Sequence, residues 1–205
     1  MADILTDATL RISEEDLKSM VLEKEQLPEE FTQFKPGREG PLDNATMAEQ
    51  GFPGSTEESF RGMGRITGYM REFASQTTDP PAKDGVDIMI ATVVHLFDDA
   101  QAVSKWMTDV FLKQFEDNIG KSMPSGQELI AIEHLVVNGF YDEVIALRAT
   151  QTKDGNSFSS TIVDFRLGRL LGVAFVVTSG DVERTSLAEK VAVELERNIV
   201  KAVLS

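Results

Sequence analysis

Three ionisable residues, Glu133, Arg148 and Asp164, interrupt the apolar alternation of strands that the sequence predicts. If their side chains converge, they could form a buried ion cluster or the polar floor of a ligand cleft. The alternative is that these strand faces are partly solvated, or that the residues pair structurally. Tyr69 and Arg71 share one face of another predicted strand and could line a groove. We predict binding residues at these five positions, with no catalytic residue, no metal-binding residue and no cofactor.

A stretch rich in glycine and arginine, RGMGRITGYMREF at residues 61–73, looks at first like a loop that holds a nucleotide phosphate. Such a loop needs its glycines at the turn from a buried strand into a helix, whose N-terminus binds the pyrophosphate. Here the residues before Gly62 are too polar for a buried strand, and those after Gly68 alternate like a strand. The pattern of residues 64–68 also recurs at 168–172, again where a turn leads into a strand. We therefore predict that these glycines serve turns and close backbone approach.

The two histidines, His95 and His134, alternate with apolar residues on predicted strands. A histidine in that setting is more often packed with one hydrogen bond than used as a metal ligand or general base. Neither lies at HxxxH or HExxH spacing, and the chain has no GxSxG motif. The alternative is a hydrolase whose carboxylates and histidine, such as Glu133, Asp164 and His134, meet only in three dimensions.

Composition narrows the range of functions. The chain has 205 residues, of which 41% are hydrophobic, and this is enough for one domain with a substantial core. Its net charge of -14 would repel a phosphate backbone, so we expect no nucleic-acid partner. The absence of cysteine excludes disulfides, thiolate metal sites and cysteine nucleophiles. No stretch approaches the length and hydropathy of a membrane span.

The first third of the chain predicts a helix and an irregular arm. Ser13 has the features of a helix N-cap, and a short helix is expected from there to about Lys24. Residues 27–61 are rich in Pro, Gly, Glu and Asn, with one short helical turn at 44–50. We expect this arm to pack across the core through its phenylalanines, Phe31, Phe34 and Phe52.

The rest of the chain alternates regularly and predicts an α+β fold. Strands are expected at 66–73, 86–97, 128–137, 143–150, 157–166 and 169–178, the last four as an antiparallel meander. Helices are expected from Asp98 to about Gly120 and from Asp181 to the C-terminus. Residues 86–97 are apolar on both faces, which is typical of a strand covered on both sides. We predict a central antiparallel sheet with helices on both faces, formed by residues 64–205, with residues 1–63 packed on it in one domain.

This layout resembles the PsbP-like group, which includes the lipoprotein LpqN and extracellular sensor domains of bacterial serine/threonine kinases. The resemblance rests on the order of VDIMIATVVHLFDDAQAVSKWM, the strands ending in FRLGRLLGVAFVV, and the C-terminal helix. It implies a non-catalytic binding or sensing domain outside the cytoplasm, from which a leader or lipid anchor has been removed. The group offers no motif from which site residues can be transferred.

The sequence is therefore compatible with three functions. The first is a non-catalytic domain that binds an unknown small molecule or protein, with sensor-like character. The second is the hydrolase described above, and the third is a structural subunit that associates with itself through an exposed sheet face or apolar helix stripe. The sequence starts without a secretory leader, which suits a cytoplasmic protein, whereas the resemblance favours an extracytoplasmic one.

Overall fold

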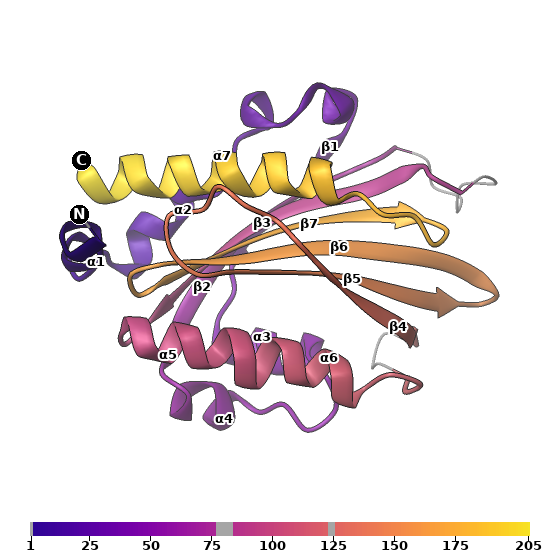
Figure 1. Cartoon of the computed structure of the whole chain (residues 1–205), viewed down its shortest axis with the longest axis horizontal. Coiled ribbons are helices and arrows are strands. Elements are labelled where there is room, and N and C mark those ends of the chain that lie inside the picture. The colour runs from indigo at the N-terminus through magenta and orange to yellow at the C-terminus, as the bar shows by residue number, and fades with distance from the viewer. Residues whose placement is uncertain (1, 77–83, 123–125) are drawn as a thin grey trace.

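The computed structural model describes residues 2–76, 84–122 and 126–205, and these residues form a seven-stranded, fully antiparallel sheet (Figure 1). The strand order is β1-β2-β3-β7-β6-β5-β4, so the predicted meander β4 to β7 forms one half of the sheet. The strands are β1 (Lys35–Pro41), β2 (Arg65–Ala74), β3 (Asp87–Phe97), β4 (Glu128–Leu135), β5 (Val144–Lys153), β6 (Asn156–Leu167) and β7 (Leu170–Ser179). The α+β class with a central antiparallel sheet is confirmed.

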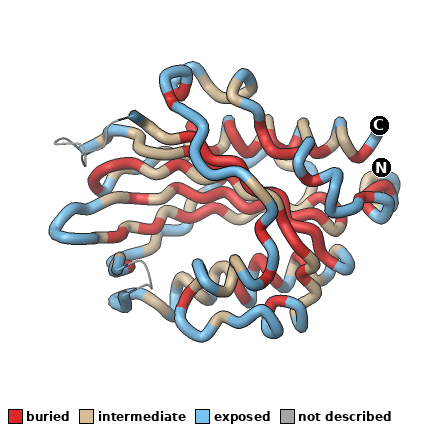
Figure 2. Tube along the Cα trace, turned by 180° about the vertical axis from the view of Figure 1, so that it is seen from behind, coloured by how far each residue is buried: buried red, intermediate tan, exposed pale blue. Residues whose placement is uncertain are grey.

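Helices cover both faces of this sheet (Figure 1). One face carries α7 (Thr185–Leu204) with α1 (Ala2–Thr9) and α2 (Leu17–Met20) beside it. The other face carries α3 (Asn44–Gln50), α4 (Glu57–Gly62), α5 (Ala100–Lys105) and α6 (Lys113–Asp117). Alternate residues of a strand point to opposite faces, so Val163 of β6 packs in the core under α7 while Ile162 packs toward α6. Figure 2 shows buried residues running through the middle of the strands, with exposed ones on loops and outer helix faces.

The N-terminal segment is less helical than predicted. Ser13 does begin a helical turn, and its backbone N–H donates to the Asp16 carboxylate over 2.7 Å. However, α2 ends at Met20, and only a short 3₁₀ turn at Lys24–Gln26 follows. The helix expected to reach Lys24 was therefore wrong at its C-terminal end, because Val21 is extended where the chain turns to pack on the sheet.

The arm contains more regular structure than its composition suggests. β1, with the sequence KPGREGP, pairs with β2 at one edge of the sheet, and α4 immediately precedes β2. Pairing of β1 shifts in register between Pro36 and Glu39, as expected where an edge strand contains proline and glycine. The three arm phenylalanines are all buried: Phe31, Phe34 and Phe52.

A single helical rod follows β3, but its middle is not α-helical. Asp99 caps α5 by accepting a hydrogen bond from the Ala102 N–H over 2.8 Å. Residues Trp106–Leu112 then form a π-helical segment before α6 completes the rod. Such segments are rare and occur frequently at functional sites, so the layer that this rod forms is of interest for function.

Candidate binding cavity

A cavity of about 340 Å³ lies between the sheet and the layer formed by α3 and the α5–α6 rod. Its floor is the sheet: Met70, Val93, His95, Ser160, Ile162, Asp164, Leu171, Val173 and Phe175. Its roof is the rod: Trp106, Val110, Phe111, Gln114 and Phe115. Its rim is the arm: Arg38, Leu42, Met47, Gln50, Gly51 and Phe52. Most of these side chains are apolar, as is usual for small-molecule sites.

The cavity interrupts what would otherwise be a close-packed core. Val173 and Phe175 lie on the central strand β7 yet are only partly buried, whereas Ala174 and Val176 on the opposite face are fully buried. Protein interiors normally leave few voids larger than a water molecule. An opening of this size therefore marks the helix-rod face as different from the α7 face of the same sheet.

Asp164 is the most unusual group of the cavity. It is only 1% exposed, and its Oδ1 atom has no hydrogen-bond partner among the residues that the structure describes. Burial raises the pKa of this carboxyl well above its usual value. A buried polar group without a partner costs free energy, so its presence here calls for a physical explanation.

His95 supplies a second polar group on the cavity floor. Its Nδ1 atom lies 2.9 Å from Nη2 and 3.2 Å from Nε of Arg65, itself fully buried. Burial, and to a lesser extent the arginine charge, lower the pKa of His95 well below its usual value. An arginine can only donate, so Nδ1 accepts and the neutral ring carries its proton on Nε2. That N–H makes no hydrogen bond with any described residue.

Arg65 is held by the arm, because its guanidinium also donates to Asn44 Oδ1 and to the Leu42 carbonyl, both over 2.6 Å. Burial lowers the pKa of Arg65 to about 10, so the guanidinium is still charged at neutral pH. Gly68 leaves room for the pair, because a Cβ atom there would lie 2.7 Å from His95 Nδ1 and 2.9 Å from Arg65 Nη2.

The glycine-rich stretch, residues 61–73, serves as a turn and an anchor and not as a phosphate loop. Gly64 has a φ of +82° and forms the turn from α4 into β2, which is a helix-to-strand order that no phosphate loop uses. In the second copy of the pattern, Gly168 also has positive φ, and Arg169 donates to the carbonyls of Thr9 and Ile12. Each arginine thus fastens a segment of the N-terminal third to the sheet.

The predicted site residues do not gather in one place. Glu133 and Arg148 pair across β4 and β5, with 2.7 Å between Oε2 and Nη2, and Arg148 also contacts Asp181 at 3.4 Å. Arg148 is opposite Thr161 in the β5–β6 register, which puts Asp164 on the other face of the sheet. Of the five predicted binding residues, Asp164 alone lines the cavity.

Tyr69 and Arg71 do come together, on the carboxylate of Glu39. The Tyr69 hydroxyl donates to Glu39 Oε1 over 2.9 Å and Arg71 Nη2 donates to the same atom over 3.0 Å. These two hydrogen bonds, the one from Arg71 first, lower the pKa of Glu39. Arg71 also donates to the Leu22 carbonyl over 3.2 Å and pairs with Glu23 at 2.7 Å. The pair therefore fastens β1 and the segment after α2 to β2, and its use in binding stays a prediction.

The prediction that His134 is packed was wrong. Its side chain is 57% exposed on the edge strand β4, where Nε2 lies 3.4 Å from Glu116 of α6. Glu133 is paired with Arg148, and Asp164 is buried on β6, so the three groups of the hydrolase alternative do not meet. The described residues also contain no cluster of three or more potential metal ligands.

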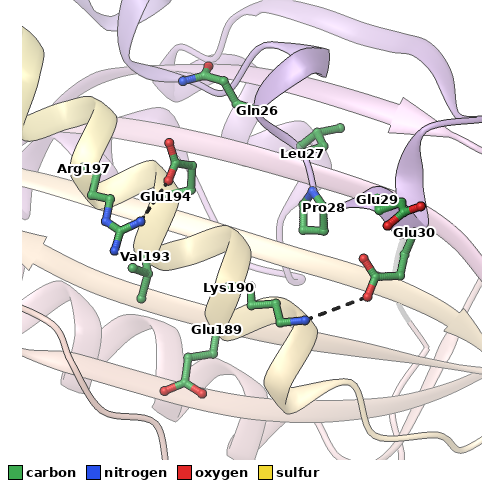
Figure 3. Close-up of a pocket in the computed structure, with 10 residues that line it drawn as sticks. All are labelled: Gln26, Leu27, Pro28, Glu29, Glu30, Glu189, Lys190, Val193, Glu194 and Arg197. Atoms are coloured by element: carbon green, nitrogen blue, oxygen red, sulfur yellow. Dashed lines mark hydrogen bonds and ion pairs between the residues drawn. The ribbon is translucent and has the colours of Figure 1, made fainter.

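A second hollow, a wide surface groove, separates residues 26–30 from α7 (Figure 3). Its ion pairs are at least partly exposed, as between Lys190 and Glu30 at 3.9 Å and between Arg197 and Glu194 at 3.3 Å. Exposed pairs of this kind contribute little to binding or stability. The cavity above β7 is therefore the better candidate site.

Comparisons with known proteins give the fold but no family. No protein-family model matches the chain, and no curated protein matches it. Among solved structures, it is similar to the extracellular domain of PknH from Mycobacterium tuberculosis, with a TM-score of 0.58 and 14% sequence identity. The match covers 93% of this chain and 97% of the other. Within the described parts of the chain, no helix has the length and apolar character needed to cross a bilayer.

Proposed function

We propose that the protein is a non-catalytic domain that binds a small, mainly apolar molecule in the cavity between β7 and the α5–α6 rod. The observation that carries this proposal is Asp164, a buried carboxyl without a partner among the described residues, facing an apolar space of about 340 Å³. That volume is within the usual range for ligand pockets, and a few polar groups in an apolar lining are their usual composition. The π-helical segment supports it, because Trp106, Val110 and Phe111 all lie in the roof.

The similarity to the PknH extracellular domain is at the level of fold. A sensor-like role, a location outside the cytoplasm and membership of the PsbP-like group are therefore parts of the same proposal. The organisation of residues 1–63 and 64–205 as one domain is a further part, supported by the contacts of Arg65, Arg71 and Arg169 with the N-terminal third.

The proposal is tested with the uncharged dye N-phenyl-1-naphthylamine, whose fluorescence rises in apolar surroundings. The wild-type protein should bind the dye, and Val173→Phe should weaken binding at least about tenfold because the larger side chain occupies the cavity floor. The matched control is Val177→Phe, which makes the same change on the same face of β7 outside the cavity lining.

Retained binding in Val177→Phe together with loss in Val173→Phe would support the cavity as the site. Equal binding by all three proteins would place the dye elsewhere and overturn the proposal. Urea unfolding of each variant confirms that the comparison is between folded proteins.

A further inference from the structure

The chemistry of the cavity narrows the class of ligand, on the premise that the proposed function holds. Its polar side-chain groups are one carboxyl, one imidazole N–H, the amide and hydroxyl groups of Gln50, Gln114 and Ser160, the indole N–H of Trp106 and the guanidinium of Arg38. Gln50 is exposed at the rim, whereas Asp164 and His95 are buried on the floor. A ligand in the cavity therefore contacts mainly apolar walls and these two buried groups of the floor.

The charges around Asp164 decide which form of the carboxyl a ligand would meet. The lining contributes Arg38, whose Nη2 pairs with Glu72 at 3.0 Å, and His95, which is neutral. Arg166 shares the sheet face of Asp164, but its guanidinium pairs with Asp142 and Glu143, which directly precede β5. No described cation therefore pairs with Asp164, and ionising it in an apolar space costs free energy.

We infer that the ligand is an uncharged, mainly apolar molecule carrying one hydroxyl or carbonyl group, which pairs with the protonated carboxyl of Asp164. A protonated carboxyl both donates and accepts, so it matches either group. A cationic amine would require that the buried carboxyl ionise and that the amine leave water, and attraction repays both costs only when further hydrogen bonds complete the pair. Asp164 Oδ1 receives no hydrogen bond from any described residue that would help to stabilise such a pair.

The sheet register places the apolar part of the ligand. Val173 of β7 is opposite Asp164, and Leu171 is opposite His95 on β3. Asp164 and His95 are separated by two strand spacings of about 4.8 Å and by two residues along the strand, each a rise of about 3.4 Å. Their Cα atoms are therefore roughly 12 Å apart. An apolar chain leaving Asp164 would run over Val173 and under Trp106 toward His95.

Four linear compounds of equal chain length test this inference: octanol, octane, octylammonium and octanoate. Each is titrated against the bound N-phenyl-1-naphthylamine, and its affinity is taken from displacement of the dye. Octanol should bind at least about tenfold more tightly than octane, because its hydroxyl pairs with a group that is otherwise left without a partner. Octylammonium and octanoate should bind more weakly than octanol.

Two variants at one position separate the contributions. Asp164→Asn keeps a donor and an acceptor and should preserve the preference for octanol to within about threefold, whereas Asp164→Leu should abolish it. Octane binding to Asp164→Leu shows that the cavity is intact, so a misfolded variant cannot imitate the expected result.

The outcomes distinguish the inference from the function on which it rests. If octylammonium binds best and Asp164→Asn loses it, the cavity binds ligands but the inference about charge is wrong. If octanol and octane bind equally to the wild type, the pairing with Asp164 is wrong. If none of the four displaces the dye, the inferred ligand class is wrong, whereas the proposed function fails only if the wild type does not bind the dye in the cavity.

Discussion

Replacing Asp164 by asparagine removes an ionisable group from the cavity while keeping the shape of the side chain. In the wild type, burial raises the pKa of the carboxyl in the folded state, so the folded protein holds this proton to a higher pH than the unfolded chain. Asparagine is neutral at every pH. The difference between the two proteins therefore isolates the titration of Asp164.

The sign and size of the effect follow from linkage. Between the unfolded pKa, about 3.9, and the raised folded pKa, the folded state binds more protons, so the wild-type free energy of unfolding falls by about 1.4 kcal/mol per pH unit. The stabilisation that the proton on Asp164 contributes is fully present at pH values below the unfolded pKa. It is lost once the pH has risen above the folded pKa. The Asp164→Asn variant should therefore gain stability relative to the wild type as the pH rises from about 4, and the gain should then level off.

Urea unfolding at a series of pH values measures this difference. Trp106, the single tryptophan, is 5% exposed in the cavity roof and reports unfolding by fluorescence. Asp43→Asn is the control of opposite sign: Asp43 accepts a hydrogen bond from the Thr46 N–H, which lowers its pKa, so the wild type should gain on that variant as the pH rises through the acid range. Parallel curves of unfolding free energy against pH for Asp164→Asn and the wild type would refute the reasoning. Such curves are expected if Arg166 turns to pair with Asp164.

Three further predictions concern the framework of the site. Gly68→Ala should destabilise the fold by about 1–3 kcal/mol in urea unfolding, because the added methyl group meets the His95–Arg65 pair. Gly62→Ala should not destabilise it, because a methyl group there meets open space. Equal effects of the two substitutions would contradict the contact at Gly68. Arg71→Met should speed hydrogen exchange in the segment after α2, while Arg61→Met, whose ion pair is exposed, should leave it unchanged; no difference between the two would contradict the anchoring role. Far-ultraviolet circular dichroism and tryptophan fluorescence should show one coincident unfolding transition, since the arm and the sheet share a core, and two separate transitions would refute the one-domain organisation.

The sheet could be predicted because its strands carry strong local signals. β3 is apolar on both faces, as a strand covered on both sides must be, and the strands of the meander are separated by turn residues. The turn between β5 and β6 is an example: Asp154 and Gly155 both have positive φ, as a two-residue hairpin of this type requires.

β1 was missed for a physical reason. The sequence KPGREGP has poor strand propensity, and the strand exists because β2 presents an unpaired edge on which this segment can pair. Proline and glycine are tolerated there because an edge strand needs fewer ladder hydrogen bonds. His134 was misplaced for a related reason. Alternation shows which residues share a face of a strand but not whether that face is covered, and β4, at the opposite edge of the sheet, is poorly covered.

The cavity had one signal in the sequence, the charged residue Asp164 in an apolar strand. Asp164 was not grouped with Arg148, because the β5–β6 register pairs Arg148 with Thr161, and Asp164 is an odd number of positions, three, further along β6 and so on the opposite face. Residues such as Val173 and Trp106 were indistinguishable from core residues. What makes them a site is volume that their neighbours leave unfilled, and no local pattern specifies it.

The most direct test of the central claim is a methyl NMR titration of the protein with octanol. We predict chemical-shift changes at methyl groups of the cavity floor, those of Val93, Ile162 and Val173, with little change at Val163 and Val176 on the opposite face. Changes confined to exposed residues outside the cavity, or no changes, would contradict the assignment of this cavity as a ligand site.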